Sequence, residues 1–489
     1  MSLVLGVDVG SQSIKAVIVD EGGDVVSSGS APLAMVHEHD GWADQDPVAF
    51  CTALRDAVRA AVEGVQADRI VAMGLGSQVD GVVACDADGT PLRSAIVWLD
   101  KRATKECDQL VSAVGSDLLA DRTGLVADAS HSAPKMMWIR DNEPEVWQRT
   151  AMLAPVGSYV LHYLSGSHAQ DAANASSTMV YDVAKGDFDD ELCEAAGLDP
   201  AMLPVVRPST DVVGALRHDV AADLGLPSTC AVVVGTGDEH AASVGAGAIE
   251  SGVIVDVTGT AEPVTTVAAE PVRDPLGVVE THGHAVPGCW LIENPGFVSG
   301  GSTLWLANLL GVPQGEIFTR ATQAPPTSDG VLFLPELSGS TAPRWNDAMR
   351  GAFLGLAMNH TSAHAARAVL EGCAYALRDI VDRLDALGLG HGEIRIVGGG
   401  ARDDLWASIK ADVLGRPVRR VLTQEATAVG AAMIAGVGAG MFTDFASALV
   451  AVQLDPHSID PDPAAQRQYA DAYGRYLAAF DAVEKALAP

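Results

Sequence analysis

The sequence predicts an α/β protein that folds as two large, related domains. The chain has 489 residues, 48% of them hydrophobic, and a chain of this length normally builds more than one core. β-branched runs with glycine turns alternate with stretches of helical periodicity in both halves. An apolar strand, an aspartate, a glycine with hydroxyl residues and a second strand occur at residues 4–19 and again from residue 253. We therefore place a boundary near Gly247, between domains of residues 1–247 and 248–489.

The first half begins with a predicted meander of strands over residues 3–27. Its β-branched runs are separated by glycine turns, and Gly22 with Gly23 marks a hairpin. Apolar residues at helical spacing predict a helix over residues 47–65. The β-branched run at residues 70–76 predicts a further buried strand.

Strands and helices continue to mix through the rest of the first half. A second hairpin is predicted to turn at Asp88 and Gly89, and helices follow around residues 103–114 and 134–164. The segment CAVVVGTGDEHAASVGAGA, residues 230–248, leads from a β-branched strand through a glycine turn into a helix of small residues.

The second half repeats this alternation after its own strand pair. A long amphipathic helix is predicted over residues 362–387. The segment EIRIVGGGARDDLW, residues 393–406, has the pattern strand, glycine loop, helix. The tail, residues 463–488, forms an amphipathic helix whose aromatic residues are expected to pack rather than to bind a ligand.

Composition excludes several classes of partner. Acidic residues outnumber basic ones by 63 to 31, so the formal charge of −32 repels nucleic acids and anionic membrane surfaces. The chain shows neither a signal-peptide pattern at its N-terminus nor an apolar run long enough to span a bilayer. We expect a cytoplasmic protein. Its odd number of cysteines without a CxxC pair indicates a reducing compartment; they are Cys51, Cys85, Cys107, Cys193, Cys230, Cys289 and Cys373.

Three glycine turns follow predicted strands and suit phosphate groups. Glycine lets backbone amides approach an anion closely, and neighbouring hydroxyls add donors. Each turn alone is more often only a turn, and neither a P-loop nor a GxGxxG pattern is present. Two hydroxyl-bearing hairpins at the starts of two domains nevertheless predict a clamp that closes on phosphates from both sides. The turns are Gly10 with Ser11 and Ser13, Gly259 with Thr258 and Thr260, and Gly398 to Gly400.

Charged residues lie beside these turns. Asp8, on the first hairpin, could hold Mg²⁺ through water, and Lys15 could reach a phosphate, although a strand lysine is often only structural. Asp238 follows a strand and precedes a helix, so it could accept the proton of an attacking hydroxyl or simply cap the helix. His240 is expected to be a packed residue because it has no partner at metal-ligand spacing.

At these residues the chain resembles the FGGY carbohydrate kinases, and among them most closely the xylulose kinases. Residues 130–142 and 351–371 fit the two signatures of the family, in the right order. The resemblance runs nearly end to end, because four further segments are similar to family segments: residues 6–20, the GWADQDP segment at 41–47, the IVWLDKR segment at 96–102 and the adenosine segment at 397–415.

The resemblance implies the fold of the actin and hexokinase group, with two actin-like ATPase (ribonuclease H-like) domains and a catalytic cleft between them. It also implies ATP and Mg²⁺ as cofactors, with Mg²⁺ near Asp8 and Asp238 as the base that deprotonates the sugar hydroxyl. The implied contacts of the nucleotide and its phosphates are Ser11, Gln12, Ser13 and Lys15 in the first loop, Gly259 and Thr260 in the second, and Gly399, Gly400 and Asp403 near the adenosine.

The sugar site implied by the resemblance is Gln78, Val79, Asp80, Asp238 and Glu239. Xylulose kinases have Met and His where this chain has Val79 and Asp80, and commonly Asn where it has Glu239. Two acids in place of neutral groups favour hydrogen-bond donors on the substrate. We expect D-xylulose as the substrate, or another pentulose or polyol such as ribulose, L-xylulose or erythritol.

Two other functions remain open on the sequence. An actin-like ATPase would explain both phosphate hairpins but not Gln78, Asp80 or the two signatures. A catalytically idle sugar sensor would explain the altered pocket, whereas the retained Asp8, Lys15, Asp238 and Thr260 disfavour it. If the protein is a kinase, we expect a small sugar or polyol as its binding partner and no nucleic acid or membrane partner. By analogy with the family we also expect a homodimer.

Overall fold

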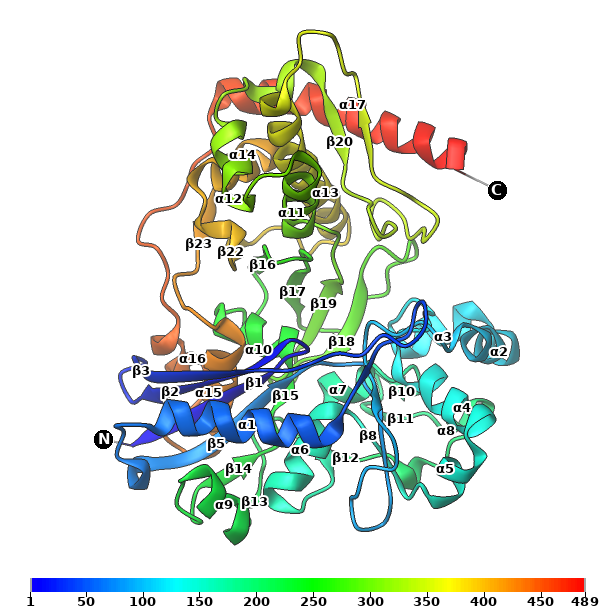
Figure 1. Ribbon diagram of the computed structural model, residues 1–489, viewed down its shortest axis with the longest axis vertical. Coiled ribbons are helices and arrows are strands. Elements are labelled where there is room, and N and C mark those ends of the chain that lie inside the picture. The colour runs from blue at the N-terminus through cyan, green and yellow to red at the C-terminus, as the bar shows by residue number, and fades with distance from the viewer. Residues whose placement is uncertain (1, 488–489) are drawn as a thin grey trace.

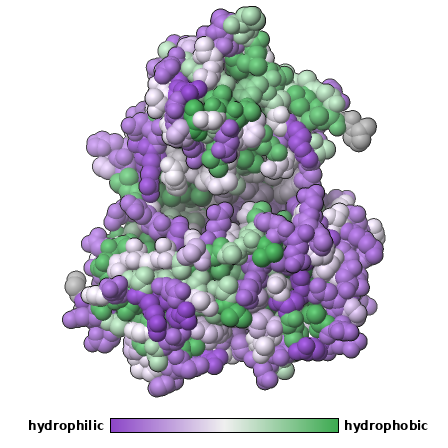
Figure 2. Space-filling model, in the orientation of Figure 1, coloured by the Kyte–Doolittle hydropathy of each residue, from purple (hydrophilic) through white to green (hydrophobic). Residues whose placement is uncertain are grey.

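The structure is a computed structural model that describes residues 2–487. Two lobes are stacked along the longest axis, with the start of the chain in the lower lobe and its last helix in the upper lobe (Figure 1). The outline narrows where the lobes meet, and hydrophilic residues cover much of both lobes on the face shown (Figure 2). Each lobe contains a mixed sheet with helices packed against it, which confirms the predicted α/β class.

The sheet of the lower lobe has the strand order β13-β14-β5-β1-β2-β3, in which β13 is Val212–Ala215 and β14 is Ala231–Val233. β1 (Leu3–Val9), β2 (Ser13–Asp20) and β3 (Val25–Pro32) form the antiparallel meander that the sequence predicts. β1 also pairs in parallel with β5 (Ile70–Ser77), and β15 (Thr236–Gly237) pairs in parallel with the end of β5. The carboxyl ends of these three strands therefore meet at one edge of the sheet, which faces the upper lobe (Figure 1).

Helix α1 (Pro47–Val62) packs on β2 and β3. Asp46 caps its first turn by accepting a hydrogen bond from the amide of Val48, and proline suits the first helical position. The helix ends three residues before the expected end because Gly64, at φ 78°, adopts a left-handed conformation that terminates helices.

The predicted helix at residues 134–164 is wrong as one element, because three helices and a strand occupy the segment. α4 (Ser132–Asn142) ends before Pro144, which starts α5 (Pro144–Arg149) because proline cannot continue a helix. β8 (Met152–Ala154) then pairs with β6 (Val83–Cys85), and α6 (Val156–Ser165) follows. The hairpin around Gly89 connects β6 to β7 (Ala95–Ile96).

The sheet of the upper lobe repeats the central topology of the lower one. β16 (Val253–Val257) pairs antiparallel with β17 (Val264–Ala268) and parallel with β22 (Glu393–Val397), as β1 does with β2 and β5. The internal repeat predicted at residue 253 is therefore present in the fold. The sheet is completed by β18 (Glu280–Gly283), β19 (Trp290–Asn294) and β23 (Val418–Arg420).

One helix of the second half belongs to the packing of the lower lobe. α15 (Ala426–Gly438) covers β1 and β5 and lies against α10 (Asp238–Gly245). The approach is so close that a Cβ atom on Gly6 would lie 1.9 Å from the carbonyl oxygen of Ala428, so glycine is required there. The domain boundary near residue 247 stays a prediction. α15 follows that boundary in the sequence but packs against elements that precede it.

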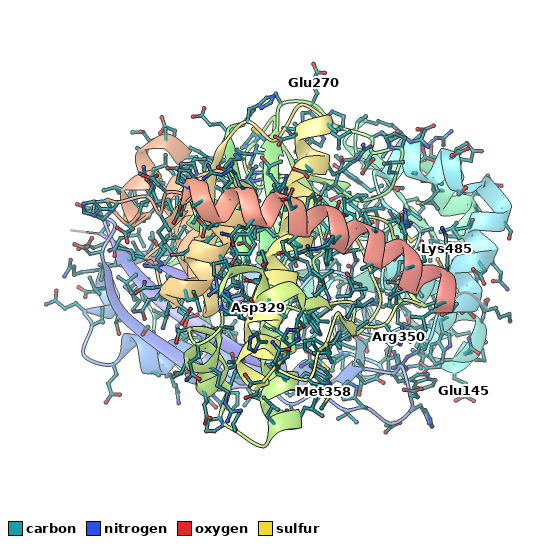
Figure 3. All side chains as sticks on the ribbon, turned by 90° about the horizontal axis from the view of Figure 1, so that it is seen from above. Glu145, Glu270, Asp329, Arg350, Met358 and Lys485 are labelled. Atoms are coloured by element: carbon teal, nitrogen blue, oxygen red, sulfur yellow. The ribbon has the colours of Figure 1, made fainter. Side chains whose placement is uncertain are left out.

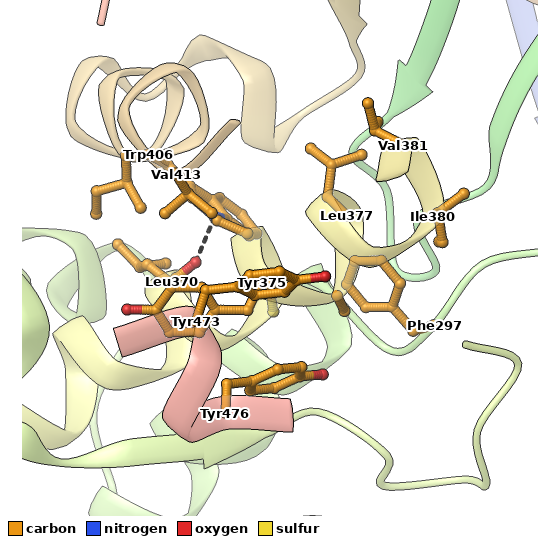
Figure 4. Packing of buried hydrophobic residues seen from close by; sticks show 14 of the residues in the cluster. Phe297, Leu370, Tyr375, Leu377, Ile380, Val381, Trp406, Val413, Tyr473 and Tyr476 are labelled. Atoms are coloured by element: carbon orange, nitrogen blue, oxygen red, sulfur yellow. Dashed lines mark hydrogen bonds between the residues drawn. The ribbon is translucent and has the colours of Figure 1, made fainter. Parts of the chain in front are cut away.

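Long helices form the core of the upper lobe. α13 (Ser362–Ala386) lies where the sequence predicts it, and α17 (Pro463–Leu487) crosses the top of the lobe, as the view from above shows (Figure 3). The last predicted residue of α17, Ala488, lies outside the described residues. Tyr375 of α13 packs against Tyr473 and Tyr476 of α17, which confirms their predicted packing role (Figure 4). α14 (Asp404–Leu414) joins this core through Trp406, whose indole donates to the carbonyl of Leu370.

The other elements are short or peripheral. They are β4 (Asp44–Gln45), α2 (Thr104–Val114), α3 (Ser116–Thr123), β9 (Ala169–Gln170), α7 (Ala172–Ser176), β10 (Tyr181–Asp182), β11 (Asp187–Phe188), α8 (Asp190–Ala196), β12 (Val205–Val206), β13 (Val212–Ala215), α9 (His218–Leu224), β14 (Ala231–Val233), α11 (Gly300–Leu310), α12 (Gln314–Ala321), β20 (Leu332–Leu334), β21 (Ala352–Leu354) and α16 (Phe445–Ala448). All seven cysteines are free thiols, six of them buried. Within residues 2–487, no helix combines the length and apolar character that crossing a bilayer requires.

Candidate active site

A cavity of about 590 Å³ lies between the two lobes and is lined by residues of both. Its position follows from the fold, because β1, β5 and β15 all end at this edge of the lower sheet. The hairpin after β1, the turn after β5 and the first residue of α10 are thereby brought together. Seven residues that the sequence predicts for the site line the cavity: Ser11, Gln78, Val79, Asp80, Asp238, Glu239 and Thr260.

The remaining predicted residues lie outside this lining, in or beside the hairpins and loops of the proposed nucleotide site. The second hairpin and the adenosine segment touch, because the amide of Gly400 donates to the carbonyl of Thr258 at 3.1 Å. Asp403 caps α14 by accepting from the amide of Trp406, so one of its oxygens has a structural partner. The residues outside the lining are Asp8, Gln12, Ser13, Lys15, Gly259, Gly399, Gly400 and Asp403.

Asp238 is the first residue of α10 and is half-buried because its carboxylate opens onto the cavity. Enclosure by the protein raises its pKa well above the ordinary 3.8, and the nearby charges of Glu239 and Asp8 raise it further. A carboxylate with a raised pKa, on the wall of a cleft, is a stronger proton acceptor than an exposed aspartate.

A histidine connects two acids on opposite lobes. Nδ1 of His131 donates to Asp80 at 3.1 Å, and Nε2 lies 3.7 Å from Glu280 of β18. Burial lowers the pKa of His131, but Asp80 and Glu280 raise it more, so the pKa stands well above 6.5. His131 is therefore an imidazolium that neutralises charge across the cleft. In the same cluster, hydrogen bonds from His131 and His282 outweigh burial and lower the pKa of Glu280 to about 2.

A buried lysine, Lys135, holds the backbone of the turn that contains Asp80. Nζ of Lys135 donates to the carbonyl of Asp80 at 2.9 Å and to the carbonyl of Ser130. Burial lowers the pKa of Lys135 to about 8. Asp80 itself adopts a left-handed backbone, with φ 61°, which Asp, Asn and His tolerate better than other side chains. The lysine thus holds the backbone of the turn at Asp80, and the Asp80 carboxylate has His131 as its partner.

Two further acids face each other across the lobes. Burial raises the pKa of Glu293 on β19 well above 4.5, and the proximity of Glu239 raises it further. His282 lies 3.9 Å from Glu280 and 4.0 Å from Glu293. The wall of the cavity opposite α10 is therefore rich in hydrogen-bond acceptors.

The first hairpin carries a carboxylate and a lysine on neighbouring strands, since Asp8 pairs in register with Lys15. Burial raises the pKa of Asp8 to about 7, which Lys15 opposes and Glu425 supports. Nζ of Lys15 donates to Glu425 at 2.6 Å, at the start of α15. The lysine predicted to bind phosphate thus has a carboxylate partner in this structure.

The second hairpin rests on a buried ionic cluster. Lys410 of α14 is 1% exposed, and its Nζ lies 2.5 Å from Asp256, 2.6 Å from Thr258 and 3.0 Å from Glu262. Burial raises the pKa of Glu262 to about 8, with a further contribution from Asp256. These contacts fix Thr258 and the strand that leads into the hairpin.

The sequence reasoning missed many residues that line the cavity, among them four members of the histidine and glutamate cluster, and it judged one residue differently. His240, expected to be packed, is buried but also lines the cavity, and neither ring nitrogen has a hydrogen-bond partner within residues 2–487. Burial, followed by His282 and His284, lowers its pKa well below 6.5, so the ring is neutral. The missed members of the cluster are His131, Glu280, His282 and Glu293. His131 lies inside the first family signature, so the sequence could have indicated it. The other three residues lie on strands of the upper lobe, and the sequence does not show that they reach the site.

Comparison with known proteins assigns the family. Models of the N-terminal and C-terminal domains of the FGGY family of carbohydrate kinases match residues 3–245 and 255–439. The chain is 31% identical over 439 residues to a xylulose kinase of Escherichia coli, covering 89% of this chain and 90% of that one. It is 33% identical over 465 residues to a glycerol kinase of Aromatoleum aromaticum, covering 91% of each.

A solved structure agrees with these sequence relatives. The fold superimposes on that of a xylulose kinase from Rhodospirillum rubrum with a TM-score of 0.91, at 29% identity and 99% coverage of both chains. The similarity therefore extends through both lobes and the cleft between them. The chain belongs to the FGGY family of carbohydrate kinases.

Proposed function

We propose that this carbohydrate kinase transfers the γ-phosphoryl group of ATP to a hydroxyl of an uncharged ketose or polyol, with D-xylulose as the first candidate. The observation that carries the proposal is the position of Asp238. Its carboxylate opens into a cavity that also contains Ser11 of the first hairpin and Thr260 of the second. A hydroxyl bound beside Asp238 would thus face phosphates held between the two hairpins.

In this mechanism Asp238 accepts the proton of the substrate hydroxyl as its oxygen attacks the γ-phosphorus in line. The raised pKa favours proton transfer to the carboxylate. Glycine at position 10 and the hydroxyls of Ser11, Ser13 and Thr260 suit binding of the phosphates. Closure of the lobes would exclude water, the competing nucleophile.

The donor set at Asp8 fits Mg²⁺. Its carboxylate is half-buried, and burial raises its pKa to about 7 although Lys15 lowers it, so a divalent cation, which favours the ionised carboxylate, would be stabilising there. Mg²⁺ bound with ATP neutralises charge on the transferring phosphates. We assign Lys15 to the phosphates as a point charge, which requires it to leave Glu425 when the nucleotide binds.

The lining indicates an uncharged substrate. Along the described lining, Lys101 is the one lysine or arginine, and it is already paired with Asp128. His131 is likewise engaged by Asp80. A sugar acid would find no free cation, whereas the hydroxyls of a ketose or polyol can donate to the surrounding carboxylates.

The proposal is tested by ATP consumption of the purified protein with Mg²⁺ against pentuloses, hexuloses and polyols. D-Xylulose, ribulose, L-xylulose, erythritol and glycerol belong in the panel, glycerol because glycerol kinases are among the similar proteins. Strong stimulation by one compound supports the kinase and names its substrate. ATP turnover that is independent of every compound would favour an ATPase, and sugar binding without turnover would favour a sensor.

Acidification should inactivate the kinase well above pH 3.8. Asp238 works as a base only when ionised, and its pKa is raised, so kcat/KM for the sugar should fall as the pH drops through that raised value and recover at higher pH. The measurement is a profile of kcat/KM between about pH 5 and 9 at saturating Mg-ATP. A flat profile down to about pH 5 would argue against Asp238 as the base.

Asp80→His should change sugar preference more than nucleotide affinity. The variant removes the carboxylate that orients His131 and places the residue type of xylulose kinases in the cavity. We expect the ratio of kcat/KM for D-xylulose to that for erythritol to rise about tenfold, with KM for ATP within about twofold. An unchanged substrate profile would exclude a role of Asp80 in recognition.

Asp329→His is the matched control for this substitution. Asp329 also has a left-handed backbone, with φ 50°, but lies in the upper lobe near the start of α13 (Figure 3). It therefore reports the cost of a histidine on such a backbone away from the cavity. We expect wild-type substrate preference from it.

A further inference from the structure

A buried glutamine connects the sugar pocket to the first phosphate hairpin. Gln45 of β4 is 1% exposed and is not part of the cavity lining. Its Nε2 donates to the carbonyl of Ser11 at 2.7 Å and to the carbonyl of Ala34 at 3.2 Å. Its Oε1 accepts from Nε2 of Gln78 at 3.0 Å. One amide group therefore contacts a residue of each site.

The bond to Gln45 decides which end of Gln78 faces the substrate. A glutamine amide has a donor end and an acceptor end, and the donor end of Gln78 is used by Gln45. Oε1 of Gln78 has no partner within the described residues, although the side chain is 1% exposed and lines the cavity. A buried acceptor without a partner is costly, so this oxygen is suited to a substrate hydroxyl.

The same glutamine restrains the phosphate hairpin from behind. Besides the Ser11 carbonyl held by Gln45, the adjacent carbonyl of Gln12 accepts from the amide of Leu33 at 2.8 Å. These two bonds hold the backbone of the hairpin. A displacement of Gln45 would therefore be transmitted to the loop proposed to bind phosphates.

Gln45 can transmit such a displacement because its own backbone is fixed on both sides. It pairs with Ala95 in the small sheet of β4 and β7. The preceding Asp44 forms ion pairs with Arg93 and Arg102, and the following Asp46 caps α1. The backbone of Gln45 is therefore fixed, and its side chain is the part that can move.

We propose that Gln45 is a positioning residue that couples occupation of the sugar site to the geometry of the first phosphate hairpin. A substrate hydroxyl that donates to Oε1 of Gln78 fixes that amide, which fixes Gln45, which in turn holds the carbonyl of Ser11. Sugar binding thereby prepares the hairpin for the nucleotide. The inference rests on the proposed function, because it requires a sugar in the cavity and phosphates at the hairpin.

Two substitutions separate the two ends of the connection. Gln45→Glu keeps an acceptor for Gln78 but turns a carboxylate oxygen toward the carbonyls of Ser11 and Ala34, so only the hairpin side is broken. Gln45→Met removes both sides with little change in size. Gln170→Met is the matched control, because Gln170 is also a buried glutamine of the lower lobe and donates to the distant carbonyl of Pro204.

The experiment measures the affinity for Mg-ADP with and without the sugar that gives the largest stimulation of the wild type. We expect the sugar to tighten ADP binding about tenfold in the wild type and in Gln170→Met, and less than about twofold in both Gln45 variants. Sugar affinity without nucleotide should stay within about threefold of wild type in Gln45→Glu and weaken about tenfold in Gln45→Met.

The outcomes distinguish this inference from the proposed function. If no compound of the panel stimulates ATP turnover, the proposed function fails and the inference fails with it. If the wild type needs sugar for turnover but its ADP affinity is the same with and without sugar, the function stands and the coupling is overturned. Coupling that persists in Gln45→Glu and Gln45→Met also overturns the role of Gln45.

Discussion

Asp238→Asn should lower kcat for sugar phosphorylation by about 10²–10⁴-fold, the contribution of a positioned general base. Asparagine keeps the shape and the polar contacts of the side chain but cannot accept the proton of the attacking hydroxyl. Affinity for Mg-ADP should stay within about twofold, because the role proposed for Asp238 is to accept the proton of the sugar hydroxyl and not to bind the nucleotide. The measurements are steady-state kinetics with the stimulating sugar and a titration with ADP.

The variant also has an expected structural signature. Asp238 stands beside Glu239 and near Asp8, and this repulsion contributes to its raised pKa, so a neutral side chain should not reduce stability. Asp190→Asn, in the first turn of α8 and exposed, is the control for the loss of one carboxylate near a helix start. Full activity of Asp238→Asn would remove Asp238 from the mechanism.

Lys410→Met should lower the free energy of unfolding by about 3–5 kcal/mol, the usual cost of removing one partner from a buried ion pair. Lys410 is the cation of a cluster in which Asp256 and Glu262 are both 0% exposed in their side chains. Without it, the carboxylate of Asp256 remains in the core with no compensating charge, and the carboxyl group of Glu262 loses its cationic partner. Denaturation by urea, followed by fluorescence, measures the loss.

Two further variants define this result. Lys485→Met removes an exposed lysine from α17 (Figure 3) and should change stability by less than about 0.5 kcal/mol. Combining Lys410→Met with Asp256→Asn and Glu262→Gln removes the ionic charges together and should restore most of the loss. A stable Lys410→Met protein, or a combined variant no better than the single one, would contradict the ionic account of the second hairpin.

Local sequence patterns predicted much of the fold, because strands, turns and helices depend largely on residues that are close together in the sequence. The β-branched runs and glycine turns gave the meander of β1 to β3, and helical periodicity gave α13 almost to the residue. Periodicity failed at residues 134–164, where a continuous apolar pattern hides two helix starts at or beside prolines and the strand β8, whose partner lies far away in the sequence. Strand pairing at such separation is not encoded in spacing.

The sequence predicted those residues of the candidate site that directly follow a strand of the lower sheet. Gln78 and Asp238 follow strands of the lower sheet, so pattern and resemblance both pointed to them, and both line the cavity. Glu280 and Glu293 sit on strands of the upper sheet and meet the site only through the packing of the lobes, which the sequence pattern does not contain. The roles assigned to all the predicted site residues remain predictions, as do the homodimer and the cytoplasmic location.

The placement of α15 sets an order of events during synthesis of the chain. The strands of the lower sheet are complete at Gly237, but the helix that covers β1 and β5 ends at Gly438, about 200 residues later. At ribosomal rates this interval lasts about 10–40 s, during which the apolar face that α15 covers on β1 and β5 lacks that helix. The nascent lower lobe therefore cannot complete its packing until α15, near the end of the chain, has been synthesised. A fragment that stops at residue 247 would keep that face exposed and would tend to aggregate.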